Sequence, residues 1–197
     1  MKKTGIYAGI AFVIVAGIIL YKSCRHDTIA SYFDRDDEGW MVVGDAQGGS
    51  AIPDYENKDG NPGGYISAND NAAGGVWYWS APEKFLGNRS SSFGKKLSFS
   101  LKQSSTDNQF DADDLILFGA DKKIVYNTSR NPDTTWTDYS VVLKEATGWT
   151  YNDSNGDPVS RNDLMKILRD LTALHIRGEY VTGEDIGGLD SVILYSK

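Results

Sequence analysis

A clean alternation of apolar and polar side chains over residues 96–102 most constrains how this chain can fold. Leu97, Phe99 and Leu101 point to one side of an extended chain, and the two serines between them point to the other. A period of two is typical of a β-strand with one buried face. Residues 115–118 form a continuous apolar run, which predicts a central strand of a sheet.

Further strand-like segments follow one another along the chain, separated by stretches rich in glycine, aspartate and asparagine. The expected strands are residues 41–43, 65–68, 76–80, 96–102, 115–118, 123–127, 137–143, 149–152, 174–180 and 187–192. About ten short strands at close spacing predict an all-β jelly-roll sandwich. The 21 glycines agree with such a turn-rich fold, and residues 44–64 are expected to be loop.

One helix is expected to interrupt the strands, over residues 160–171. Ser160 can cap its first turn, with Asp163 three residues later as a partner for the cap. The apolar residues of this segment recur at helical spacing, so one face should pack against the sandwich. These residues are Leu164, Ile167, Leu168 and Leu171.

The N-terminus predicts a membrane anchor. Two lysines precede residues 4–21, which are eighteen residues without a charge. At 1.5 Å per residue a helix of this length reaches roughly 27 Å, which is just enough to cross a bilayer core. No small-residue cleavage site follows the segment, so we expect an uncleaved single-pass anchor rather than a removed signal peptide.

The predicted organisation is therefore an anchor with its flanks at 1–27, a tether at 28–33 and one domain at 34–197. The short N-terminal tail favours a domain that faces the periplasm or the cell exterior. A bacterial lipoprotein with lipid on Cys24 is an alternative, although Tyr21 and Lys22 fit that processing signal poorly.

Composition argues against several classes of function. A net charge of −7 disfavours nucleic-acid binding, because no basic stripe is present to neutralise phosphates. The single cysteine, Cys24, excludes an internal disulfide bond. His26 and His175 are the two histidines, so a zinc site or a histidine-based triad lacks its residues. No compact acid and nucleophile motif is present, and we expect no enzyme activity.

Several motifs in a fixed order resemble one known family. They are Gly60–Ile66, the aromatic strand and turn Val76–Arg89, the helix at 160–171 leading into the strand at 174–180, and Gly187–Val192. This set resembles the laminin IV type A domain, also called the laminin B domain. The resemblance covers roughly residues 34–195.

The resemblance implies an extracellular β-sandwich module, of a family that also occurs as single domains in small anchored proteins. The disulfide-rich repeats that flank this module in animal laminins have no counterpart here. The resemblance therefore implies the fold and gives no ground for a role in basement-membrane assembly.

Calcium is the cofactor that the resemblance makes plausible, in a structural role. The architecture is similar to that of jelly-roll carbohydrate-binding modules with a galactose-binding-like fold, many of which hold one calcium near their first and last strands. The opening segment Phe33–Trp40 looks similar to theirs, and calcium prefers carboxylate and carbonyl oxygens. The expected ligands are Asp34 and Asp36 before the first strand and Asp190 in the last. The acidic segment at 153–157 is expected to be a plain turn.

The five tryptophans and eleven tyrosines supply possible sugar-binding surfaces. Sugars dock on aromatic faces because their C–H surfaces are apolar. Trp77 and Trp79 share one face of their strand, and Trp40 is expected in the core. The candidates for ligand contact are Trp136, Trp149, Tyr55 and Tyr65.

The leading hypothesis is a non-catalytic, membrane-anchored module that binds a glycan, or an extracellular protein, outside the cytoplasm. A structural or adhesive spacer without a small-molecule ligand is the alternative. An exposed aromatic pair would favour binding, and five buried tryptophans would favour the spacer.

Overall fold

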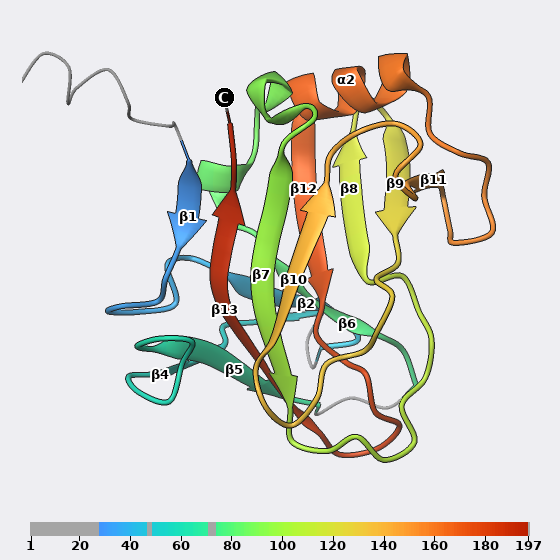
Figure 1. Ribbon diagram of the computed structural model, residues 1–197. Helices are drawn as coiled ribbons and strands as arrows, with labels where there is room; N and C mark the ends of the chain where they lie inside the picture. Colours follow the sequence, from blue (N-terminus) through green and yellow to red (C-terminus); the bar gives the residue numbers. More distant parts are fainter. Residues whose placement is uncertain (1–27, 47–48, 71–73, 197) are drawn as a thin grey trace, which may run out of the picture.

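The computed structural model describes residues 28–46, 49–70 and 74–196, which form two antiparallel sheets packed face to face (Figure 1). The first sheet has the strand order β10-β7-β13-β5-β4, and β1 pairs with the end of β13. Its strands are β1 (Ile29–Ser31), β4 (Asp54–Glu56), β5 (Tyr65–Asn69), β7 (Lys96–Gln103), β10 (Thr137–Val142) and β13 (Ile186–Leu194). We call it the site sheet, because its outer face carries the pocket described below.

The second sheet, which we call the back sheet, has the order β11-β9-β8-β12-β6-β2-β3. Its strands are β2 (Met41–Gly44), β3 (Ser50–Ala51), β6 (Trp77–Ser80), β8 (Leu115–Gly119), β9 (Lys122–Tyr126), β11 (Thr150–Tyr151) and β12 (Leu171–Arg177). Two short 3-10 helices, Glu83–Phe85 and Ser90–Ser92, follow β6. The described residues contain one α-helix, α2 (Arg161–Arg169), so the expected all-β sandwich with one short helix is confirmed.

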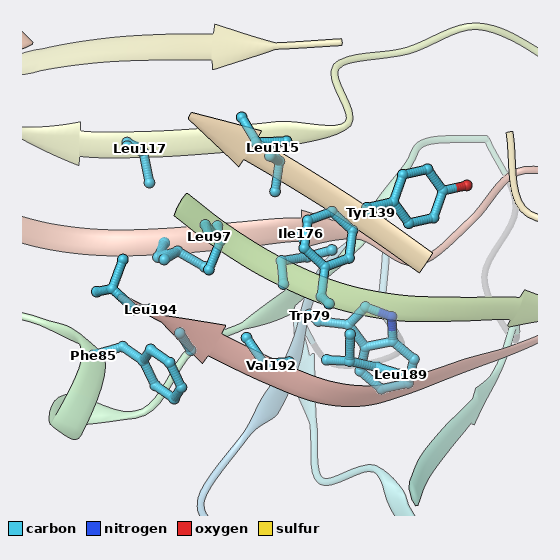
Figure 2. Packing of buried hydrophobic residues seen from close by; sticks show 14 of the residues in the cluster. Trp79, Phe85, Leu97, Leu115, Leu117, Tyr139, Ile176, Leu189, Val192 and Leu194 are labelled. Carbon is cyan, nitrogen blue, oxygen red and sulfur yellow. The ribbon is translucent and has the colours of Figure 1, made fainter. Parts of the chain in front are cut away.

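The core lies between the sheets, where the alternation in β7 places its apolar side chains. Leu97, Phe99 and Leu101 are at most 2% exposed, and they face apolar residues of the back sheet. Figure 2 shows Leu97 of β7 on one side of the core and Leu115 and Leu117 of β8 on the other. Trp40 is fully buried, as expected, and its indole N–H donates to the Ser31 hydroxyl over 2.8 Å.

Several boundaries differ from the sequence-based expectation. The tether expected at 28–33 contains β1 (Ile29–Ser31), and the strand expected at 174–180 is β12 (Leu171–Arg177). The helix begins as expected, with the Ser160 hydroxyl accepting from the Asp163 backbone N–H over 3.2 Å, but it ends at Arg169. Leu171 instead begins β12, because its backbone pairs with Gly119 of β8. The expected loop at 44–64 contains β3 and β4, which are too short and polar to have an apolar period.

A β-bulge in β13 sets which of its side chains face the core. Asp190 pairs with Ser100 and Ile193 with Ser98, so β13 has one extra residue between these pairs. Ser191 takes up the irregularity with a φ of 51°. As a result Leu189 and Val192 both face the core although they are three residues apart (Figure 2). Asp190 alternates with Leu189 and faces the outer side, where it accepts from the Asn61 backbone N–H.

Arg177 at the end of β12 holds three loops together inside the protein. Its side chain is 1% exposed and donates to the Asp114 carboxylate at 3.3 Å, to the Phe110 carbonyl at 2.7 Å and to the Glu179 carbonyl at 2.6 Å. Its guanidinium carbon also lies 4.2 Å from the ring centroid of Tyr180. Asp114 accepts in turn from the backbone N–H and the hydroxyl of Thr128, both at 2.7 Å.

The substitution Asp114→Asn is expected to lower the free energy of unfolding by about 3 kcal/mol, because it leaves the buried Arg177 cation without its counter-charge. Urea denaturation measures this loss. The matched control is Lys166→Gln, which removes an exposed ion pair with Asp163 and should cost under about 1 kcal/mol. Equal effects of the two substitutions would contradict a structural role for the buried pair.

Candidate functional site

A shallow pocket of about 280 Å³ lies on the outer face of the site sheet. Its walls come from β5, β7, the start of β13 and the loop before β10. Tyr65 and Lys102 form one side, and Gly187 and Gly188 line it from β13. Strand pairing explains this grouping, because Lys102 lies opposite Gly188 in the sheet.

An aromatic pair borders the pocket. The rings of Tyr65 and Trp136 meet edge to face with centroids 5.3 Å apart and an interplanar angle of 82°. The Trp136 indole N–H donates to the Asp59 carbonyl over 3.0 Å, which fixes the orientation of the ring. Both side chains are partly exposed, so this pair combines apolar surface with access to solvent.

The ammonium group of Lys102 lies against both rings. Its Nζ atom is 3.8 Å from the centroid of Tyr65 and 4.6 Å from that of Trp136. A cation at these distances is attracted by the electron-rich ring faces. Within the part of the chain that the structure describes, no carboxylate lies at ion-pair distance from Lys102.

The two glycines of β13 allow close packing on both faces of the strand. A Cβ atom on Gly188 would lie 3.0 Å from Lys102 Cγ and 3.3 Å from Trp136. A Cβ atom on Gly187 would point inward, 2.8 Å from the buried Trp77 ring and 2.7 Å from the Gly178 carbonyl. Glycine in a strand often marks such a close approach.

The β4–β5 hairpin loop carries the carbonyl that holds Trp136, and Asn61 fastens this loop to the sheet. The Asn61 side-chain amide donates to Asp138 at 2.9 Å and to the Ser100 hydroxyl at 3.1 Å. Its backbone N–H donates to Asp190, and its carbonyl accepts from the Ser191 hydroxyl over 2.7 Å. One residue therefore contacts β7, β10 and β13 and sets the position of the loop.

The expected calcium ligands are only partly gathered. Burial raises the pKa of Asp190 to about 6, and the nearby negative charge of Asp34 contributes to this shift. Asp36 lies apart in a turn, where its carboxylate accepts from the Glu38 backbone N–H over 2.9 Å. The described ranges contain no group of three or more histidine, cysteine, aspartate or glutamate side chains placed to hold a metal.

Two of the four aromatic candidates lie away from the pocket. Trp149 was expected to be exposed, which is wrong: it is 2% exposed, packs against Tyr126 and donates to the Val142 carbonyl over 2.9 Å. Its polar neighbours suggested exposure, but the turn before it brings the ring under the end of β10. Tyr55 pairs with the core residue Ile66, so its side chain packs toward the core, whereas Tyr65 faces outward.

Sequence reasoning found Tyr65 and Trp136 but missed Lys102, Asn61 and the role of Gly188. The alternation over 96–102 does place Lys102 on the outer face, and the Gly-Gly pair in a strand does indicate close packing. The pairing that makes these residues neighbours joins segments far apart in the sequence, and nothing local reveals it.

The predicted anchor at 4–21 and Cys24 lie outside the described residues. Across residues 28–46, 49–70 and 74–196, no helix is long and apolar enough to span a membrane.

Comparisons with known proteins give a consistent family match. A family model described as Laminin B (Domain IV) matches residues 78–196. Laminin subunit gamma-1 of Xenopus tropicalis is 30% identical over 181 residues, which is 86% of this chain and 10% of that protein. The basement membrane proteoglycan of Caenorhabditis elegans is 27% identical over 176 residues, covering 85% of this chain and 5% of that protein. This chain thus spans a tenth or less of the length of these relatives.

A solved structure has the same fold. The L4b domain of human laminin alpha-2 superposes with a TM-score of 0.70 at 16% identity, covering 86% of this chain and 97% of that domain. At this sequence identity, the similarity shows that the two domains share an arrangement of strands.

The packing around β13 predicts that alanine substitutions at Gly187 and Gly188 lower the free energy of unfolding by different amounts. Gly187→Ala should lower the free energy of unfolding by about 2 kcal/mol, because its methyl group would press on backbone and on the Trp77 ring. Gly188→Ala should cost under about 1 kcal/mol, because the flexible Lys102 side chain can move aside. Urea denaturation of both variants tests the difference, and a larger cost at Gly188 would contradict the inward and outward assignment.

Proposed function

The chain belongs to the Laminin B (Domain IV) family of non-catalytic modules, and from this premise we propose that it binds glycans at the pocket beside Tyr65 and Trp136. Laminin-like domains are extracellular, so the proposed ligand lies outside the cytoplasm. We further propose that residues 4–21 span a membrane once and that the domain is a galactose-binding-like jelly roll facing the periplasm or the cell exterior. The uncharged length of that segment supports the anchor.

One observation carries the glycan proposal: a partly exposed aromatic pair beside a pocket on a sheet face. A sugar ring could lay its apolar C–H surface on the Tyr65 and Trp136 rings, as aromatic side chains offer large contact area at low entropic cost. Its hydroxyls would find a polar partner at the pocket wall in the exposed Thr134, whereas the Ser104 hydroxyl already donates to Asp185 over 2.6 Å. A few polar groups around an apolar surface are the usual composition of small-ligand sites.

The alternative is a structural or adhesive spacer that contacts an extracellular protein. Burial of Trp40, Trp77, Trp79 and Trp149 supports this alternative, because four of the five tryptophans serve the core. The partial exposure of Trp136 favours the glycan proposal instead.

Binding to a glycan array tests the proposal. Trp136→Ala in the full-length chain is expected to weaken binding to the best array ligand by at least about tenfold, because it removes the larger aromatic face. Tyr195→Ala is the matched control, since this exposed tyrosine follows the far end of β13 and should leave binding unchanged. An array without any bound glycan would favour the spacer.

We also propose a structural calcium ion between Asp34 and Asp190. The two carboxylates lie close enough for one to raise the pKa of the other, and a cation between them would relieve this repulsion. Backbone carbonyls and water would have to supply the remaining oxygens, because calcium takes six to eight. The proposed pair leaves out Asp36, which does not contribute to the raised pKa of Asp190. The Asp190 carboxylate also accepts from the backbone N–H groups of Asn61 and Ser191, so calcium would share its oxygens with these donors.

Calcium at millimolar concentration is expected to raise the midpoint of thermal unfolding by about 5 °C, because a ligand that binds only the folded state stabilises it. EDTA should reverse the rise. Asp34→Asn should abolish the shift, and Asp36→Asn should preserve it. No shift in the parent protein, or equal loss in both variants, would rule out the proposed pair of ligands.

A further inference from the structure

Lys102 is an unusual group to find in this pocket. The protein has 27 acidic and 20 basic residues, so carboxylates are plentiful as partners for lysines. Lys102 nevertheless points at two aromatic rings, and among the described residues it makes no ion pair. Its ammonium also lies 3.4 Å from the Asp59 carbonyl, which is a long contact for a hydrogen bond.

The remaining described residues that line the pocket are uncharged. They are a tyrosine, a glutamine, a serine, a threonine, an isoleucine and the two glycines of β13. The pocket therefore presents one cation to a ligand that rests on the aromatic pair.

We propose that the pocket selects negatively charged sugars, with Lys102 contacting the carboxylate of a uronic acid or the sulfate of a sulfated sugar. The inference rests on the proposed function, since it names the class of glycan that the same site would take. Contact with two rings already restricts the rotamers of Lys102 in part, which lowers the entropy lost on binding an anion, and a charge-assisted hydrogen bond is about twice as strong as a neutral one. The sugar ring would pack on the aromatic surface that Lys102 leaves uncovered, while the ammonium contacts the charged group of the sugar.

The position of Lys102 makes this contact geometrically reasonable. Gly188 lies opposite it in β13, and the absence of a side chain there leaves room beside the ammonium-bearing chain. The aliphatic part of Lys102 packs closely on the strand, with Cγ 3.0 Å from where a Cβ atom of Gly188 would be, and its charged end lies 3.8 Å from the centroid of the Tyr65 ring.

Acidic side chains near the pocket would repel a negatively charged ligand. Asp138 lies on the same face, but its carboxylate accepts from Asn61 at 2.9 Å and from the Ser100 hydroxyl at 2.7 Å. Asp133 accepts from the Thr134 backbone N–H over 2.6 Å. Asp185 also borders the pocket wall, because its carboxylate accepts from the hydroxyl and the backbone N–H of the lining Ser104, at 2.6 and 3.1 Å. Among the described residues none of these carboxylates is at ion-pair distance from Lys102, so the direct contact of a ligand with Lys102 acts over a shorter distance than their repulsion.

The experiment compares charged glycans with their uncharged counterparts on the full-length chain. The probes are uronic-acid oligosaccharides beside their methyl esters, and sulfated oligosaccharides beside their desulfated forms. At low salt, about 50 mM, a charged probe should bind about tenfold more tightly than its uncharged counterpart, and about 500 mM salt should reduce this preference. The two pairs distinguish a carboxylate ligand from a sulfate ligand.

Three variants assign the preference to one residue. Lys102→Met keeps the aliphatic chain and should bring the charged-to-uncharged ratio close to one. Lys102→Arg should keep most of the preference. Lys96→Met is the matched control, because it removes the same charge from the same strand roughly 20 Å away and should leave the ratio unchanged.

The outcomes separate failure of this inference from failure of glycan binding. If uncharged probes bind as well as charged ones and Trp136→Ala still abolishes binding, the inference is wrong and the glycan function stands. If Lys102→Met weakens both members of a pair equally, Lys102 only supports the rings, and the inference is again wrong. If no probe binds, the glycan function and the inference both fail.

Discussion

The close approach of side chains to both faces of β13 at Gly187 and Gly188 is the contact on which the core and the pocket both depend. On the inner face, the Trp77 ring occupies the space where a side chain of Gly187 would lie. On the outer face, Lys102 and Trp136 occupy the corresponding space at Gly188. Without a disulfide bond in the domain, such dense packing must supply its stability, and two residues without side chains make the packing possible.

The bulge two residues further along β13 joins the core to the loop over the site. It lets Leu189 and Val192 both reach the core, and its extra residue, Ser191, donates its hydroxyl to the Asn61 carbonyl in the hairpin loop. Asp190 then accepts from the Asn61 backbone, and the fastened loop presents the Asp59 carbonyl to Trp136. The orientation of the partly exposed Trp136 ring therefore depends on hydrogen bonds that the loop makes to Asp190 and Ser191, beside the bulge of β13.

Sequence patterns predicted the elements whose structure depends only on residues close together in the chain. The alternation in β7, the apolar run of β8 and the Ser160 cap each depend on residues within one element, and each lies where expected. Trp149 shows the limit: its neighbours are polar, yet its burial is decided by packing on Tyr126, over twenty residues earlier in the chain. The contacts of Lys102 could not be predicted for the same reason, because its partners lie in three other segments of the chain.

The strand pairing also determines where the pocket lies relative to the proposed anchor. Ile29, at the start of β1, pairs with Leu194 at the end of β13, whereas the pocket lies at the beginning of β13 (Figure 1). About six residues of extended strand separate the two, or roughly 20 Å. A chain that enters the domain from a membrane at β1 would therefore hold the pocket at the opposite end of the site sheet. A glycan in the surrounding space could reach the Tyr65 and Trp136 rings there without meeting the membrane surface.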